Sequence, residues 1–289
     1  MQLSSVPIRS RLKQALLSTP AGRVALVGPR ALMALKASRV APRLGSVLAW
    51  SVRSRETVNF TYETTRESNM LLAGTVAELT GRPMQEMVGY LDELASDKTL
   101  AQYVSRAAEA PESRWNVDPG FHPGRRLAFY LIARSLKPSC VVEAGVDKGL
   151  GAVLLSRALR RNASEGRAGD YLGIDINREK RIGLYEGYEG KVGRILRGDA
   201  IELMRAAQDS VDLFIHDTTP EPGHLIAMLE AVRPRMSRNG VIASTWTTAA
   251  LIDYAVANGL KLLTHQEDTV HHWFHGDRMA FLYGFAGKS

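Results

Sequence analysis

The sequence is poor in cysteine and in long hydrophobic runs. Its single cysteine, Cys140, excludes an intrachain disulfide and a zinc site built from cysteines. The longest uncharged apolar run of the N-terminal part, from Leu44 to Val52, is half of the roughly 18 residues that a bilayer span needs. With 289 residues, 45% of them hydrophobic and 23% charged, the chain is neither disordered nor collagen-like. We therefore expect a globular protein of a reducing cytoplasm that buries a sizeable core.

Acidic residues are almost absent from positions 1–60, which hold ten lysines and arginines but one acid, Glu56. This segment carries a net charge of +9, whereas the remainder, with 27 basic and 29 acidic residues, carries −2. The near-neutral body gives no sign of a nucleic-acid surface. The basic leader is open to three interpretations: a packing or oligomerisation arm, a transit peptide, or a segment that contacts an acidic membrane surface or polyanion through helices such as Ile8–Ser18 and Arg30–Val40.

Two changes of pattern divide the chain. Residues 61–119 show the apolar spacing of helices, at Ser68–Leu79 and Met84–Ala95. From about residue 121, short apolar runs alternate with helical stretches. We therefore expect a basic leader over 1–60, a helical cap region over 61–119 and a sheet-containing domain over 120–289.

The short apolar runs predict the strands of that last domain. Helical stretches between them require crossover connections, which give a mostly parallel sheet with helices on both faces. The fold class is therefore α/β and Rossmann-like, with ligands beyond the carboxyl ends of the strands. The predicted strands are Cys140–Ala144, Tyr171–Ile176, Val192–Leu196, Val211–Ile215, Val241–Ser244, Leu260–Leu263 and Met279–Tyr283.

The loop after the first predicted strand is rich in glycine. It places Glu143 before Gly145, Gly149 and Gly151, so the spacing is E-x-G-x-x-x-G-x-G. Three glycines let a backbone turn tightly and approach a ligand closely. This spacing is not the G-x-G-x-x-G of a dinucleotide site, and an acid here would repel a pyrophosphate. The loop suits a ligand with an ammonium or sulfonium charge.

Acidic residues also follow the next three strands. Asp175 ends the second strand, where a carboxylate can accept hydrogen bonds from a ribose diol. Asp199 follows the third strand and can accept from an adenine amino group, and the fourth ends in His216 and Asp217. Each acid alone is more often a helix cap, so the ordered series carries the prediction.

These motifs resemble those of class I S-adenosylmethionine-dependent methyltransferases, with a seven-stranded Rossmann-like sheet. The resemblance is to bacterial small-molecule and sugar O-methyltransferases related to the macrocin and cephalosporin enzymes, and it spans roughly residues 58–285. Its motifs are VVEAGVDKGLG, YLGIDIN, RGDA, VDLFIHD and HHWFHG. It implies S-adenosylmethionine as cofactor, held by Glu143, Gly145, Lys148, Gly149, Gly151, Asp175, Ile176, Asp199, Ala200 and His216.

Two departures from that family bear on metal binding. Relatives commonly carry further acids after the fourth and fifth strands, whereas this chain has Thr218 and Thr219 after Asp217, and Thr245 and Trp246 after the fifth strand. Magnesium prefers several hard oxygen ligands with one or two carboxylates. We therefore predict no catalytic metal. Trp246 is expected either to form a wall of the acceptor pocket or the cofactor site, or to belong to the core.

All seven histidines lie from residue 122 onward, and one of them is expected to remove the acceptor's proton. His216 is the first candidate, with Asp217 as the carboxylate that orients its ring. His272 is the second. The alternative for each is a structural or surface histidine, and a metal site at the histidines of residues 271–275 is disfavoured.

The sequence therefore predicts methyl transfer from S-adenosylmethionine to a hydroxyl, or an amine, of a small molecule in a biosynthetic or natural-product pathway. Expected partners are the small-molecule acceptor and further copies of the chain, without nucleic acid and with peripheral membrane contact through residues 1–50. Two alternatives stay open. One is a cofactor-binding protein that has lost catalysis, and the other is a nucleotide-sugar or nicotinamide enzyme of similar fold.

Overall fold

The computed structural model describes residues 40–56, 58–110, 113, 117–177 and 183–285. The chain divides into two units, the first with Met1–Arg53 and His271–Trp273 and the second with Ser54–Val270 and Phe274–Ser289. The predicted leader helix Ile8–Ser18 lies outside the described residues, as does Arg30–Val40 except for Val40.

The first unit contains helix α4 (Val40–Arg53), which has no acidic residue. The indole of Trp50 packs against that of Trp273, with ring centroids 5.3 Å apart. Leu48 and Val52 are exposed. None of the helices in the described part of the chain is long and apolar enough to cross a membrane.

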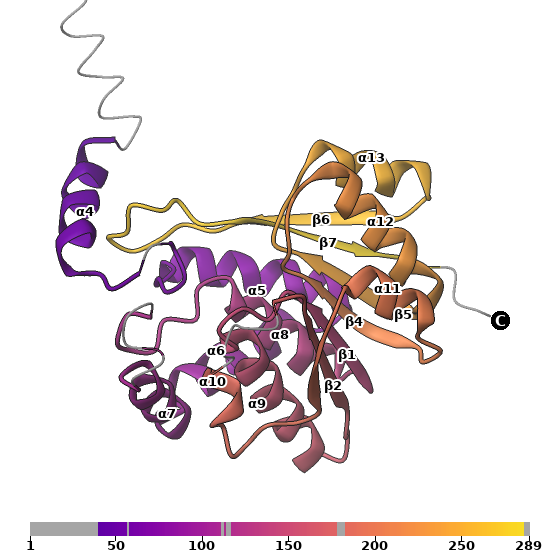
Figure 1. Cartoon of the computed structure of the whole chain (residues 1–289), viewed down its shortest axis with the longest axis horizontal. Helices are drawn as coiled ribbons and strands as arrows, with labels where there is room; N and C mark the ends of the chain where they lie inside the picture. The colour runs from indigo at the N-terminus through magenta and orange to yellow at the C-terminus, as the bar shows by residue number, and fades with distance from the viewer. Residues whose placement is uncertain (1–39, 57, 111–112, 114–116, 178–182, 286–289) are drawn as a thin grey trace, which may run out of the picture. The chain divides into compact units, whose positions relative to one another are not determined.

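The second unit is built on a seven-stranded sheet in the order β3-β2-β1-β4-β5-β7-β6. The pairs along β3-β2-β1-β4-β5 are parallel, and β7 runs antiparallel to β5 and β6 (Figure 1). The predicted α/β class and seven strands are confirmed. The strands are β1 (Cys140–Ala144), β2 (Asp170–Asp175), β3 (Arg194–Arg197), β4 (Val211–His216), β5 (Met236–Ser244), β6 (Lys261–Gln266) and β7 (Arg278–Tyr283).

Successive side chains of a strand point to opposite faces of a sheet, and this alternation gives the unit two cores. Val141 belongs to the core that includes residues of α8 (Arg126–Leu136) and α9 (Leu150–Ser164). Val142 belongs to the other core, with residues of α11 (Ala200–Ala206), α12 (Pro222–Val232) and α13 (Ala249–Ala257). Both faces of the sheet are therefore covered by helices.

The predicted helical region precedes the sheet and belongs to the same unit. It contains α5 (Arg66–Thr80), α6 (Met84–Ala95) and α7 (Lys98–Ala108). The Thr65 side chain caps α5 by accepting from the Ser68 amide, and Gly81 ends it in the left-handed conformation. Both α5 and α6 pack on α8. The short helices α10 (Gly183–Glu186) and η1 (Arg233–Arg235) complete the unit.

Candidate active site

The glycine loop after β1 lies directly against the chain that leaves β4. Gly145 has a φ of 92°, and a Cβ atom there would lie 2.2 Å from the backbone oxygen of Asp217. The Asp217 amide donates to the Ala144 oxygen at 2.9 Å, which holds the two segments together. Gly149, with a φ of 94°, begins α9. A side chain at Gly145 would therefore push apart the two loops that face the carboxyl edge of the sheet.

Asp175, at the end of β2, ties the glycine loop to its own strand. Its Oδ2 accepts from the amide of Asp147 at 2.9 Å, and its Oδ1 accepts from the amide of Asn177 at 2.8 Å. Asp147 has a φ of 51°, an uncommon conformation for a residue with a side chain. The carboxylate thus supports a strained turn, and each of its oxygens has a second lone pair for a ligand.

Glu143 is buried beneath the loop. The hydroxyl of Tyr171 donates to Glu143 Oε2, and a Cβ at Gly151 would lie 2.1 Å from Oε1. Burial raises the pKa of Glu143 to about 8. Its contacts place Glu143 under the start of α9 as a support of the loop, and direct contact with a ligand stays a prediction.

The residues predicted to hold an adenosine lie at the ends of β2 and β3. Ile176 is 72% exposed, an unusual position for a large apolar side chain. Asp199 Oδ1 accepts from the amides of Ile201 and Glu202 and so caps α11, while Ala200 is half-buried. The Gly198 amide donates to the Asp175 oxygen at 3.1 Å and brings the two strand ends together. The helix cap leaves Asp199 Oδ2 for the predicted adenine contact.

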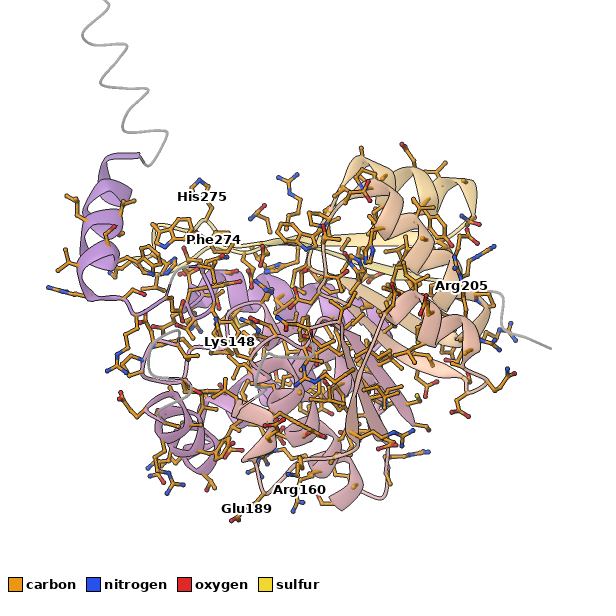
Figure 2. All side chains as sticks on the ribbon, viewed as in Figure 1. Lys148, Arg160, Glu189, Arg205, Phe274 and His275 are labelled. Atoms are coloured by element: carbon orange, nitrogen blue, oxygen red, sulfur yellow. The ribbon has the colours of Figure 1, made fainter. Side chains whose placement is uncertain are left out.

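Lys148 belongs to the glycine loop (Figure 2). Its Nζ lies over the ring of Phe60, 3.9 Å from the ring centroid. Its Nζ also lies 3.9 Å from a carboxylate oxygen of Asp147. Burial lowers the pKa of Lys148 to about 8. The loop therefore presents a partly desolvated cation beside its glycines.

His216, at the end of β4, is fully buried and contacts two hydroxyls. Its Nδ1 lies 3.2 Å from Ser244 Oγ, and its Nε2 lies 3.0 Å from Thr218 Oγ1. Ser244 donates its own hydroxyl proton to the Trp246 oxygen, so it accepts from His216 Nδ1. Nε2 is therefore the basic nitrogen and faces Thr218. Burial lowers the pKa of His216 to about 4, which keeps the ring neutral near pH 7.

The expected pairing of Asp217 with His216 is wrong. Asp217 Oδ1 accepts from the Thr245 hydroxyl at 2.9 Å, and it pairs with Arg125 NH2 at 3.2 Å. The two residues adjoin at the end of β4, where successive side chains point to opposite faces. Burial raises the pKa of the Asp217 carboxyl, but the guanidiniums of Arg125 and Arg126 outweigh burial and lower that pKa below its ordinary value.

A charged cluster around Arg125 was not found from the sequence. Besides Asp217, Arg125 pairs through NH1 with Asp277 at 3.1 Å, and its amide donates to the Tyr62 hydroxyl at 3.0 Å. That hydroxyl donates to Glu267 at 2.7 Å. Burial raises the pKa of Glu267 to about 7. These residues come from four distant segments of the chain, so no local sequence motif indicates the cluster.

Two further predicted residues have clear positions. Trp246 is 37% exposed and its Nε1 donates to the Thr218 oxygen at 2.9 Å, so the core interpretation of Trp246 is wrong. His272 belongs to the first unit, where its ring meets that of Trp50 edge-on with centroids 6.5 Å apart. Its catalytic role stays a prediction.

A comparison with known protein families gives a match within the part of the chain that forms the sheet. Residues 142–244 match the model of a family described as a methyltransferase domain. This part of the chain is similar to methyltransferase domains. The match covers β1 to β5 and therefore includes the glycine loop, the acids after β2 and β3, and the β4 end. It confirms the resemblance that those motifs indicate. S-adenosylmethionine is accordingly the cofactor of this domain.

Solved structures with similarity to the chain are distant. TomG from Streptomyces achromogenes, an O-methyltransferase involved in tomaymycin synthesis and solved with SAM, is 13% identical over 65% of this chain and 91% of its own, with a TM-score of 0.45. An O-methyltransferase from Bacillus cereus with SAH is 13% identical over 65% and 90%, with a TM-score of 0.44. A methyltransferase from Geobacter sulfurreducens is 16% identical over 70% and 97%, with a TM-score of 0.45. A search of curated proteins gives no match.

The residues of the methyltransferase domain fit this cofactor. Gly145 and Gly149 both have a positive φ, which glycine adopts without strain, and Gly145 lets the loop pack closely on the chain after β4. Asp175 keeps acceptor capacity for a diol, and the exposed side chain of Ile176 next to it offers an apolar face for a base. Asp199 Oδ2 lies outside the helix cap. These carboxylate acceptors suit a ribose diol and an adenine amino group better than a diphosphate, and their contacts with the cofactor stay a prediction.

Proposed function

We propose that the protein transfers the methyl group of S-adenosylmethionine to a hydroxyl of a small molecule in a biosynthetic pathway. The match to a methyltransferase domain over residues 142–244 is the observation that carries the proposal. When bound, S-adenosylmethionine supplies an electrophilic methyl group on a sulfonium. The chain must then hold the acceptor in line, and such positioning can supply about 7–11 kcal/mol of the barrier.

His216 is proposed as the general base, acting through Thr218. The acceptor hydroxyl donates to Thr218 Oγ1, and the Thr218 proton passes to His216 Nε2 over the 3.0 Å contact. A fully buried imidazole does not touch the acceptor itself, whereas Thr218 is half-buried. Proton removal of this kind contributes about 10²–10⁴ in rate. Trp246, bonded to the Thr218 oxygen, forms a wall beside the relay.

We propose that the reaction is metal-independent because a guanidinium already neutralises the carboxylate at the β4 end. Arg125 pairs with Asp217 at 3.2 Å, and the neutral Thr245, directly after β5, donates its hydroxyl to the same carboxylate. A divalent cation at Asp217 would be repelled by the positive charge of Arg125. Asp217 would also offer it one carboxylate, whereas magnesium favours several hard oxygen ligands. The acid thus serves to hold Arg125 and the loop.

The proposal is tested with variants of the two adjacent threonines. Radiolabelled S-adenosylmethionine is incubated with a panel of phenols and sugars, and methylated product is counted. Thr218→Val removes the relay hydroxyl and is expected to lower kcat about 10²-fold or more without weakening S-adenosylhomocysteine binding. Thr219→Val, the control, changes an exposed hydroxyl next to it and is expected to keep full activity.

Each result of that experiment separates two hypotheses. Equal rates for both variants would refute the relay. Cofactor binding without product from any acceptor would favour the alternative of a cofactor-binding protein that does not methylate. The neutral Thr245, at a position where relatives commonly carry an acid, is the sequence feature behind this alternative. No binding of S-adenosylhomocysteine at all would refute the proposed function as a whole.

A further inference from the structure

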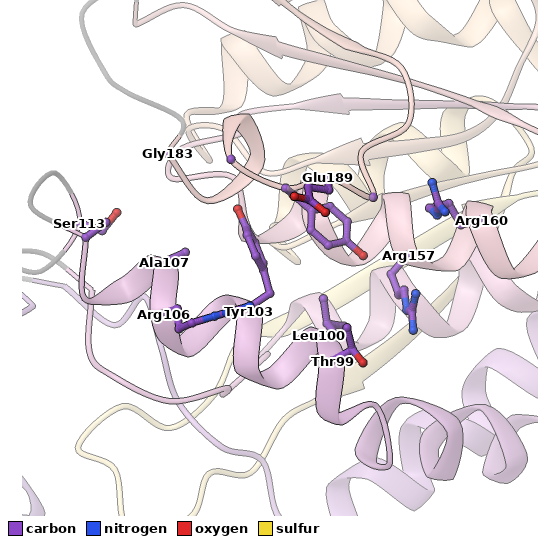
Figure 3. A pocket seen from close by; sticks show the side chains of 14 residues that line it. Thr99, Leu100, Tyr103, Arg106, Ala107, Ser113, Arg157, Arg160, Gly183 and Glu189 are labelled. Atoms are coloured by element: carbon purple, nitrogen blue, oxygen red, sulfur yellow. The ribbon is translucent and has the colours of Figure 1, made fainter.

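A cavity of about 690 Å³ lies in the second unit, between α7, the second half of α9 and residues 183–190 (Figure 3). This volume is within the range of about 300–1,000 Å³ that small-molecule sites have. Its lining shares no residue with the glycine loop, with the acids after β2 and β3, or with the charged cluster of Arg125. The cavity is thus a second place where the fold has room for a ligand.

The lining of the cavity is rich in arginine. Arg106 projects from α7, and Arg157 and Arg160, one turn apart, from α9 (Figure 3). Asp97 already holds Arg157, with Nε 2.6 Å from Oδ2. In the part of the chain that the structure describes, neither Arg106 nor Arg160 forms an ion pair. One acid, Glu189, also lines the cavity, so the lining carries an excess of positive charge.

Two tyrosines provide an aromatic wall. The rings of Tyr103 and Tyr188 have centroids 4.9 Å apart, and both line the cavity. The Tyr103 hydroxyl donates to the Leu184 oxygen at 2.6 Å, which fixes this ring against α10. A Cβ atom at Gly187 would lie 3.2 Å from that hydroxyl, so glycine here lets the tyrosine approach the chain. Arginine beside fixed aromatic rings suits a ligand that is both anionic and planar.

We propose that this cavity binds a small aromatic anion, with either Arg106 or Arg160 on its carboxylate or phosphate group and the tyrosine wall on its ring. The inference goes beyond the proposed function and does not depend on methyl transfer. Arg106 and Arg160 lie at opposite ends of the cavity (Figure 3), so a charge-assisted hydrogen bond to one of them would hold the anionic group.

The cavity is connected to the glycine loop through α10. Tyr103 bonds the Leu184 oxygen, and the Leu184 amide donates to the oxygen of Lys148 at 3.2 Å. A ligand that packs on the tyrosine wall therefore also stabilises the position of α10, which supports the backbone of Lys148. Coupling between two sites is reciprocal, so the anion and the cofactor are expected to tighten each other's binding.

The test uses phenyl phosphate as the probe and isothermal calorimetry on the full chain. Wild-type protein is expected to bind phenyl phosphate saturably and more tightly than inorganic phosphate or phenol. One of the two variants Arg106→Gln and Arg160→Gln is expected to weaken binding by about tenfold, and it identifies the arginine that holds the anionic group. Arg205→Gln is the matched control, because Arg205 is an exposed arginine on α11, away from Arg160 (Figure 2). Thermal unfolding of each variant confirms that the fold is intact.

The outcomes are decisive in both directions. Equal affinity of wild type and the two cavity variants, or displacement of phenyl phosphate by S-adenosylhomocysteine, would overturn the site. Inorganic phosphate that binds as tightly as phenyl phosphate would overturn the role of the tyrosines. An affinity for S-adenosylhomocysteine that rises about fivefold with saturating phenyl phosphate supports the coupling, and an unchanged affinity overturns it. A protein that proves inactive on every acceptor but binds phenyl phosphate at one of these arginines leaves the inference standing.

Discussion

Replacing Asp175 with alanine tests the prediction that this carboxylate holds the ribose of the cofactor. The carboxylate accepts two backbone hydrogen bonds, at 2.9 Å from Asp147 and 2.8 Å from Asn177, and is predicted to accept two more from a ribose diol. Hydrogen bonds to a charged group are worth about 1.5–3 kcal/mol each. Because water replaces part of the ligand contact, we expect Asp175→Ala to cost about 1–3 kcal/mol of cofactor binding, or about 5- to 150-fold in Kd.

The same substitution removes support from the turn at Asp147, so loss of affinity alone does not prove a ribose contact. Calorimetry with two ligands separates the effects. Wild-type protein is expected to bind adenosine more tightly than 2′-deoxyadenosine, because the missing hydroxyl leaves Asp175 short of a donor. Asp175→Ala is expected to bind the two ligands equally, as in a double-mutant cycle between side chain and hydroxyl.

The control is Asp253→Ala, which removes an exposed carboxylate on α13 and should leave both affinities unchanged. If Asp175→Ala keeps the wild-type preference for adenosine, Asp175 does not hold the ribose. If it also keeps the wild-type affinity for S-adenosylhomocysteine, the assignment of the cofactor site to the ends of β1 and β2 fails with it.

Three further predictions concern stability and the leader. Arg125→Met leaves two buried acids without their cation and is expected to lower the free energy of unfolding, measured in urea, by about 3–5 kcal/mol. The control Arg55→Met breaks an exposed ion pair and is expected to cost less than about 1 kcal/mol. Similar losses for the two variants would contradict this prediction. Burial raises the pKa of Glu143 from an ordinary 4.5 to about 8. Between pH 4.5 and pH 8, Glu143 is therefore protonated in the native state and ionised in the unfolded chain. The stabilisation from this group is complete below pH 4.5 and disappears as pH rises through 8, and Glu143→Gln should flatten that part of the urea stability profile. Deletion of residues 1–53 should leave S-adenosylhomocysteine affinity intact and change either oligomer size by sedimentation or attachment to anionic vesicles; if neither changes, the leader has neither role.

Strands could be predicted from the sequence because apolar runs record burial on both faces of a sheet. The strand Cys140–Ala144 has the predicted bounds, as does the helix Met84–Ala95, which was predicted from its helical apolar spacing. The bounds of β5 differ because the strand begins at Met236 and passes a register shift against β4 before the apolar run at Val241. The register shift leaves no mark in the hydrophobic pattern.

The site was predictable only where its residues follow strands in order. Asp175 and the glycine loop meet as expected, because the carboxyl ends of β1 and β2 lie at one edge of the sheet. His216 and Asp217 are adjacent in the chain, and the sequence therefore predicts that the carboxylate orients the imidazole. The alternation of side chains at the end of the strand separates them instead. Arg125 has no local signal, since its partners come from chain segments 92 and 152 residues away.

The close approach at Gly145 connects the two halves of the proposed chemistry. The loop after β1 is expected to hold the cofactor, and the chain after β4 carries the Thr218 and His216 relay. These segments are held together by the Asp217 amide on the Ala144 oxygen, and Arg125, at the start of α8, holds the Asp217 side chain. An in-line displacement tolerates little error in the distance between methyl donor and acceptor. The backbone contact between the two loops therefore supports the proposed roles, in which Asp217 sets the geometry and His216 takes the proton.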